Sequence, residues 1–87
     1  MALYNVVIDK QVRKKDLPPL PTKYRDQIVA RIIKLADDPF PNDSMQLKGR
    51  EERRIRQGAY RILYIVKVKT VTVHVVKVGH RSHVYKA

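Results

Sequence analysis

The chain has 87 residues, a length that fits one small domain covering residues 1–87, and it has no cysteine, which excludes a disulfide framework. No apolar stretch approaches the roughly 20 residues of a membrane-spanning helix, and the first apolar run, "VVI", is too short for the core of a signal peptide. We therefore expect a soluble, cytoplasmic protein. Its formal net charge of +11 indicates a polyanionic partner: nucleic acid, an acidic membrane surface or an acidic protein.

The first half of the sequence predicts a strand and two helical segments. The stretch "LYNVVIDK" (3–10) is rich in β-branched residues and predicts a short strand. The polar stretch 9–17 predicts one or two helical turns, which the prolines of "PPLP" (18–21) end. From Thr22 onward, apolar residues recur every three or four positions, which predicts an amphipathic helix that stops at "DDPFPND" (37–43).

The second half predicts three strands. The stretches "RRIRQ" (53–57), "YRILYIVKV" (60–68) and "VTVHVVKVG" (71–79) are rich in β-branched and aromatic residues, and Gly58 and "KT" (69–70) separate them at hairpin spacing. We expect an antiparallel meander with the first strand added at an edge and the helices over one face. The predicted fold class is α+β: an N-terminal strand and a helical hairpin packed on a small antiparallel β-sheet.

Positive charge is concentrated in this second half. Residues 1–44 hold eight basic and six acidic side chains, whereas residues 45–87 hold eleven basic and two acidic ones. Arg54 and Arg56 lie two apart on a predicted strand and share a face, and a hairpin brings Arg61 close to Arg56. Three neighbouring guanidinium groups suit a bound phosphate, because each can form a bidentate contact. The alternative is that they are ordinary exposed strand charges.

Residues 80–85 carry side chains that could transfer protons or stack on a base. His80 and Arg81 follow the third predicted strand, and His83 and Tyr85 come shortly after. Histidine transfers protons near neutral pH, and tyrosine stacks on bases or donates a hydrogen bond. By composition alone this is a weak indication of an active site. With His74 as the one further histidine and no cysteine, we expect no metal site, and no nucleotide-binding loop indicates a cofactor.

The sequence resembles a known family over nearly its whole length. The ordered stretches "LKG" (47–49), "RRIRQGAYRILYIV" (53–66) and "VTVHVVKVGHRSHVY" (71–85) are similar to RelE-type toxins of the RelE/ParE superfamily. The resemblance implies a type II toxin that an acidic, largely helical antitoxin neutralises. It also implies metal-independent cleavage of messenger RNA in the decoding site of the ribosome, near the 16S rRNA of the A site, by attack of the 2′-OH on the adjacent phosphate, with no membrane involved.

The same resemblance assigns roles to individual residues. It implies that Arg54, Arg56 and Arg61 hold the phosphate, that Arg81 serves the transition state and leaving group, and that Tyr85 stacks on a nucleotide. A guanidinium hardly deprotonates, so a histidine, His80 before His83, is expected to transfer the proton. The residues assigned to RNA binding are Lys48, Arg53, Lys77 and His83.

Two other functions remain open at the level of sequence. ParE-type toxins share the fold but poison DNA gyrase by binding; they generally lack the full set of basic residues with the terminal tyrosine, which disfavours this interpretation. A non-catalytic module that only binds nucleic acid would need the same positive charges, so the sequence distinguishes it poorly.

Overall fold

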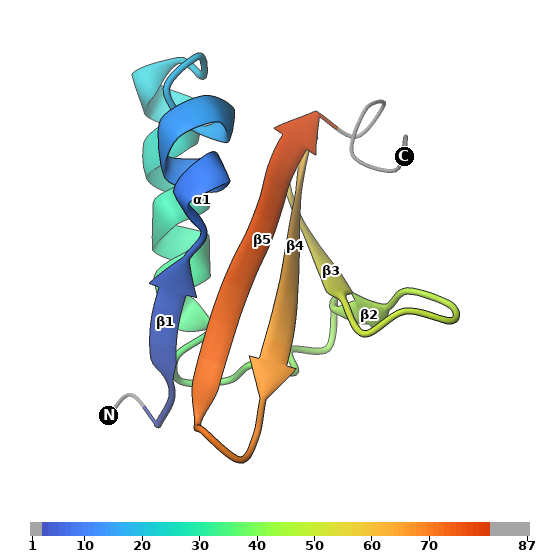
Figure 1. The fold of residues 1–87 in the computed structure, drawn as a ribbon. Helices are drawn as coiled ribbons and strands as arrows, with labels where there is room; N and C mark the ends of the chain where they lie inside the picture. Colours follow the sequence, from blue (N-terminus) through green and yellow to red (C-terminus); the bar gives the residue numbers. More distant parts are fainter. Residues whose placement is uncertain (1–2, 81–87) are drawn as a thin grey trace.

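The computed structural model describes residues 3–80, in which one sheet is covered on one face by helical segments (Figure 1). The five strands lie in the order β1-β5-β4-β3-β2. The elements in chain order are β1 (Asn5–Ile8), the π-helical turn η1 (Val12–Asp16), α1 (Thr22–Lys34), β2 (Met45–Gln46), β3 (Arg53–Gln57), β4 (Tyr60–Lys67) and β5 (Thr72–His80). The predicted α+β class and the helical layer on one face are confirmed.

The sheet is mixed rather than purely antiparallel, which corrects one part of the expected fold. β3, β4 and β5 form the expected antiparallel meander and β2 extends it, but β1 pairs with β5 in parallel, with Asn5 opposite Thr72 and Ile8 opposite Val75. Hairpin turns force neighbouring strands to run antiparallel, whereas the two helical segments carry the chain away from β1. β1 is therefore free to pair in parallel, at the edge where it was expected.

Short strands and turns differ from their expected limits for local reasons. β1 spans four residues instead of eight, and the two-residue strand β2 was not predicted because it is too short to show an alternating pattern. Gly58 adopts φ +62° in the β3–β4 turn, which glycine does without strain. Val71 adopts φ +51° before β5, an unfavourable conformation for a β-branched residue.

The core lies between the sheet and the helical layer. On α1, Ile28 and Ile32 are fully buried, as the apolar spacing predicts. The buried residues that form the main cluster come from both layers: Val12, Leu17, Ile28, Ile32, Leu35, Ile55, Ile62, Tyr64, Val73, Val75 and Val78. Within residues 3–80, no helix combines the length and apolar character needed to cross a membrane.

A bulge in β5 changes which side chains face this core. Tyr64 pairs with Val75 but its neighbour Leu63 pairs with Lys77, so Val76 is an extra residue on β5. Side chains alternate between the two faces of a strand, and one extra residue reverses the alternation. Val75 and Val78 therefore both face the core, although they are three residues apart.

Asp16 connects η1 to the strand just beyond the bulge. The backbone N–H of Val78 donates to Asp16 Oδ2 at 3.0 Å, and Lys77 Nζ lies 3.7 Å from Asp16 Oδ1. β1 ends before this part of β5, because its last paired residue is Ile8 opposite Val75. The Asp16 carboxylate thus supplies an acceptor where the neighbouring strand no longer does.

We predict that Tyr64→Phe lowers the free energy of unfolding by about 1–2 kcal/mol at pH 7, because the fully buried Tyr64 hydroxyl donates to the Pro39 carbonyl at 2.8 Å. Burial raises the pKa of Tyr64, against hydrogen bonds with Ser44 and Arg53 that lower it. The folded state therefore holds this proton more tightly than the unfolded state does. The stabilisation is complete below about pH 10 and is lost as the pH rises through the folded-state pKa.

Urea unfolding of both proteins at several pH values measures this effect. The difference between native protein and Tyr64→Phe should shrink above pH 10. Tyr24→Phe is the matched control, because Tyr24 is 43% exposed. A difference that stays constant or grows above pH 10 would contradict the prediction.

Candidate functional site

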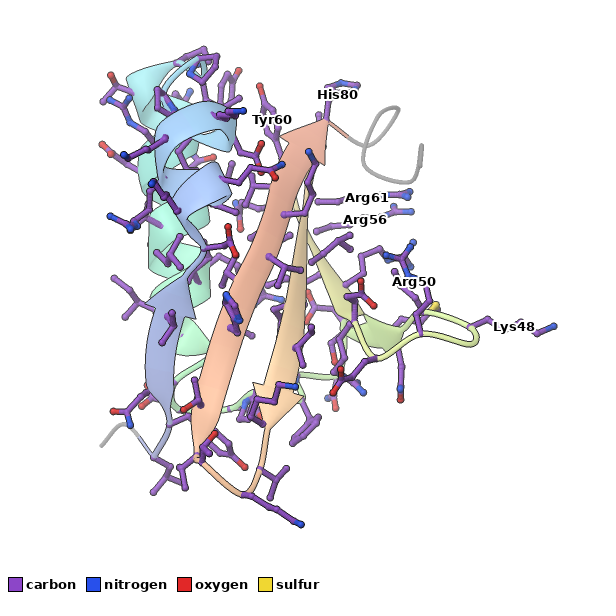
Figure 2. The ribbon with its side chains drawn as sticks, in the orientation of Figure 1. Lys48, Arg50, Arg56, Tyr60, Arg61 and His80 are labelled. Atoms are coloured by element: carbon purple, nitrogen blue, oxygen red, sulfur yellow. The ribbon has the colours of Figure 1, made fainter. Side chains whose placement is uncertain are left out.

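Four basic side chains share the face of the sheet that the helices leave uncovered. Arg56 of β3 lies directly opposite Arg61 of β4, and Leu63 lies between Arg54 of β3 and Lys77 of β5. Residues in register across neighbouring strands share a face. We call Arg54, Arg56, Arg61 and Lys77 the basic face. Figure 2 shows Arg56 and Arg61 extending next to each other, away from the helical layer.

Arg61 lies in a position with room for its long side chain. Its partner on β5 is Gly79, which has no side chain, and its partner on β3 is Arg56. Arg56 is exposed, whereas Arg61 is half-buried. An exposed and a half-buried arginine therefore lie opposite each other on adjacent strands, where both can contact one anion.

The floor of the basic face is apolar. Leu63 is only 3% exposed although no helix covers it. Its register neighbours Arg54 and Lys77 lie on either side of it, where their aliphatic stems are placed to cover it. Arg54 also contacts Met45 of β2, with Nη2 3.6 Å from Sδ. The surface thus combines hydrophobic support with an outward layer of positive charge.

Nearby carboxylates pair with Lys77 but not with Arg56: Lys77 Nζ lies 3.7 Å from Asp16 Oδ1, and the two glutamates of the β2–β3 loop pair elsewhere. Glu52 bonds Arg50 at 2.7 Å, and this bond is the main cause that lowers the Glu52 pKa, so Glu52 stays ionised in its own pair. Glu51 pairs with Lys67 at 3.2 Å. Among residues 3–80, Arg56 forms no ion pair with a carboxylate. The arrangement can therefore bind a phosphate.

Lys48 and Arg50 lie apart from the basic face. They extend from the loop between β2 and β3, which projects from the sheet (Figure 2). Gly49 between them adopts φ +70°. Lys48 was predicted to bind RNA; Arg50 was not singled out, and in the structure it is paired with Glu52 of the same loop. Residues 47–52 carry two basic and two acidic side chains, so the loop as a whole has no net charge, and Lys48 is the cation that it extends away from the sheet (Figure 2).

Arg53 faces the other side of the sheet from its neighbour Arg54. It pairs with the buried Tyr64, and its guanidinium carbon lies 5.1 Å from the centre of the Phe40 ring. Its Nη2 donates to Ser44 Oγ at 2.8 Å. These contacts give Arg53 a structural part in closing the core, and the structure does not bring it together with the other residues predicted to bind RNA.

His80 also lies on the helix-covered side. It is opposite Tyr60 in register, and the two ring centres are 6.0 Å apart in an edge-to-face arrangement. Tyr60 and Arg61 are consecutive on β4 and point to opposite faces. The structure therefore separates the His80 ring from the guanidinium pair, although both lie at the same end of the sheet (Figure 2).

Arg81, His83 and Tyr85 lie outside the described residues, so their predicted roles stay predictions. Within residues 3–80, no group of three or more histidine, aspartate or glutamate side chains is placed to hold a metal ion. A surface hollow of about 360 Å³ is lined by Asp9, Lys10, Gln11, Lys14 and Lys15, away from the basic face. The basic face is an open surface, which suits a polymer better than an enclosed small molecule.

Comparison with known sequences identifies similar toxins. A family model described as the ParE toxin of the type II toxin–antitoxin system parDE matches residues 7–85. A protein of Methanocaldococcus jannaschii named "Putative toxin RelE1" is 34% identical over an alignment of length 89 that covers 95% of this chain and 96% of that protein.

Solved structures show the same fold. A chain of the archaeal RelE–RelB complex from Pyrococcus horikoshii is 30% identical, with a TM-score of 0.81, and the match covers 93% of this chain and 98% of that one. A chain of the Mycobacterium tuberculosis toxin–antitoxin complex RelBE2 is 26% identical, with a TM-score of 0.77 and coverage of 90% and 98%.

We predict that Arg56→Gln raises the free energy of unfolding by about 0.2–1 kcal/mol at low ionic strength, because like charges directly opposite each other destabilise a sheet. Urea unfolding at low and high salt measures this, and the gain should shrink as salt screens the repulsion. Arg50→Gln is the control, since it removes a guanidinium that is paired with Glu52. A loss of stability in Arg56→Gln at low salt would show that Arg56 is not under repulsion.

Proposed function

This chain belongs to the RelE/ParE superfamily of type II toxins, and we propose that it inhibits translation in the cytoplasm by cutting messenger RNA on the ribosome. The observation that supports this most directly is the pair Arg56 and Arg61, opposite each other on the uncovered face. Two planar guanidinium groups, with Arg54 and Lys77 beside them, match the oxygens of a phosphodiester. A partner protein that only needed positive charge would not require two arginines directly opposite each other.

The proposed reaction uses only groups of the RNA and of the protein. The 2′-oxygen attacks the adjacent phosphorus, the bond from phosphorus to the 5′-oxygen breaks, and the products are a 2′,3′-cyclic phosphate and a 5′-hydroxyl. Negative charge builds on the non-bridging oxygens in the transition state, where fixed guanidinium groups stabilise it most. In this proposal the basic face supplies that stabilisation without a metal ion or other cofactor.

Two proton transfers complete this reaction. The 2′-hydroxyl loses a proton and the leaving 5′-oxygen gains one. Arginine does neither task well at neutral pH. His80 and His83 remain the candidates for these transfers. The contact of His80 with Tyr60 holds its ring on the opposite side of the sheet from Arg61, which favours His83 over the order expected from sequence.

The projecting loop fits a large RNA surface. Lys48 and Arg50 extend beyond the sheet, on an element separate from the basic face (Figure 2). In the proposal this loop contacts ribosomal RNA around the 16S region of the A site while the basic face holds the messenger. Binding at both places would be sensitive to salt, because each contact releases counterions.

The partner that silences the toxin is proposed to be an antitoxin. The similar solved structures are toxin–antitoxin complexes, in which RelE is bound to RelB or the pair is named RelBE2. An acidic, largely helical segment would complement the net charge of +11. Covering the basic face would exclude RNA and neutralise repulsion among its arginines at the same time.

A second candidate function follows from the family model, whose description names ParE. A ParE-type toxin would inhibit DNA gyrase by binding and leave RNA intact. The placement of Arg56 and Arg61 side by side on adjacent strands favours phosphodiester chemistry instead. A third candidate is a module that binds nucleic acid without cutting it, and an experiment must distinguish it from a nuclease and from a gyrase inhibitor.

We predict that Arg56→Ala and Arg61→Ala each lower the rate of messenger cleavage by about 10²–10³-fold, because each removes a donor to the charge of the transition state. Arg81→Ala and Tyr85→Ala should also abolish or sharply reduce growth arrest while leaving antitoxin binding largely intact. Cleavage is measured by mapping messenger ends on translating ribosomes, and growth arrest by induction in cells.

Lys69→Ala is the control for charge, because Lys69 lies in the exposed β4–β5 turn. It should cut RNA at the native rate. Inhibited supercoiling with intact messenger would establish the gyrase function. If the protein neither cuts messenger nor inhibits supercoiling, it is a module that only binds nucleic acid. Full toxicity of both Arg81→Ala and Tyr85→Ala would overturn the assignment of the C-terminal site.

A further inference from the structure

Three aromatic rings meet at the end of the sheet, on the side away from the basic face. The Tyr60 ring lies between the other two: its centre is 5.8 Å from that of Tyr24 on α1 and 6.0 Å from that of His80 on β5. We call Tyr24, Tyr60 and His80 the aromatic cluster. Three elements far apart in the sequence contribute one ring each.

Two of these rings remain open to solvent. Tyr24 is 43% exposed, and His80 is also exposed, whereas the rings and aliphatic groups of the main core are almost completely buried. Only Tyr60 packs partly against the core. A cluster that served only to close the core would bury its outer rings, whereas the exposed ring of Tyr24 can be reached by a ligand.

The aromatic cluster and the basic face are two sides of one narrow edge. Tyr60 and Arg61 are neighbours on β4, and the β3–β4 turn at Gly58 ends the sheet next to them. Figure 2 shows Tyr60, His80, Arg56 and Arg61 at this same end. A strand of RNA that crosses the edge would pass from the guanidinium pair to the rings.

The helix turn that carries Tyr24 has a small excess of positive charge. Lys23 and Arg25 flank Tyr24 in the sequence, and the first turn of α1 contains no acidic residue. Asp26 comes next on the helix, and Asp16 is engaged by the N–H of Val78. Aromatic rings interleaved with basic side chains are typical of surfaces that bind single-stranded RNA.

We propose that the aromatic cluster is a base-stacking subsite, which holds the base of a nucleotide next to the phosphate gripped by the basic face. The inference rests on the proposed function, because it takes RNA as the ligand of the basic face. Tyr24 and His80 would offer their rings to the base, and Tyr60 would hold these two rings apart and in place. The subsite makes His80 a binding residue rather than a proton carrier.

Binding of an uncleavable RNA tests this subsite. The probe is a labelled single-stranded 2′-O-methyl RNA of nine nucleotides, whose blocked 2′-oxygens cannot attack, and binding to the full chain is followed by fluorescence anisotropy. Tyr24→Leu should weaken binding by about 5- to 150-fold, the range for one stacked base, while Tyr24→Phe should bind like the native protein. Tyr4→Leu is the control, because Tyr4 packs against the core in a partly buried position next to β1.

A second measurement separates stacking from a loss of structure. The same RNA is prepared in versions that each lack one base, and the missing base is moved along the strand. One of these versions should bind native protein and Tyr24→Leu equally, because the base that stacks is already gone. A structural defect would weaken binding to every version by the same factor.

The outcomes distinguish the two proposals. If Arg56→Gln and Arg61→Gln weaken binding but Tyr24→Leu does not, the stacking subsite is wrong and RNA recognition by the basic face stands. If the effect of Tyr24→Leu is the same for every version of the RNA, the subsite is also wrong. If the native protein binds no RNA, or binds it independently of Arg56 and Arg61, the proposed function fails and the subsite with it.

Discussion

The extra residue Val76 in β5 determines the character of both faces of this protein. Without it, the side-chain alternation set by Val73 and Val75 would place Lys77 in the core and Val78 in solvent. With it, valines continue to seal the core, and a lysine joins the arginines across the sheet. Asp16 supports β5 at this point, because its carboxylate accepts a hydrogen bond from the backbone N–H of Val78. The basic face and the aromatic cluster both lie on the part of the sheet beyond the bulge, so both depend on it.

The first two residues of β3 point to opposite faces of the sheet. Arg53 points to the core side, where Phe40 and Ser44 hold it, and Arg54 points to the open side. Like charges that face each other work against folding, and natural proteins keep such conflicts mainly where function requires them. Here the buried Leu63 and its covering side-chain stems offset part of that conflict. We interpret the basic face as a surface whose instability is relieved when a phosphate or an acidic partner binds.

Sequence patterns predicted the parts of the fold that repeat regularly. The spacing of Ile28 and Ile32 identified α1, and alternation identified β3 and the placement of Arg54 and Arg56 on one face. The bulge was not predictable, because nothing in the run of valines marks Val76 as the extra residue, and so the opposite faces of His80 and Arg61 were missed. The positive φ of Val71 and the parallel pairing of β1 were missed for a similar reason: tertiary contacts set them, not local preference. Arg53 was grouped with its neighbours by charge alone, although the alternation already separates it from Arg54.

The pairing of β1 with β5 has a consequence for the order of events during synthesis. The partner of Asn5 is Thr72, so the first strand leaves the ribosome long before its neighbour exists. Domains form as the chain is made from its N-terminus, and contacts between distant residues form late. The sheet, and with it the basic face, is therefore completed only when almost the whole chain has emerged. The surface that a partner of the basic face would recognise is therefore absent until the last strand is in place, so such a partner can bind only after that point.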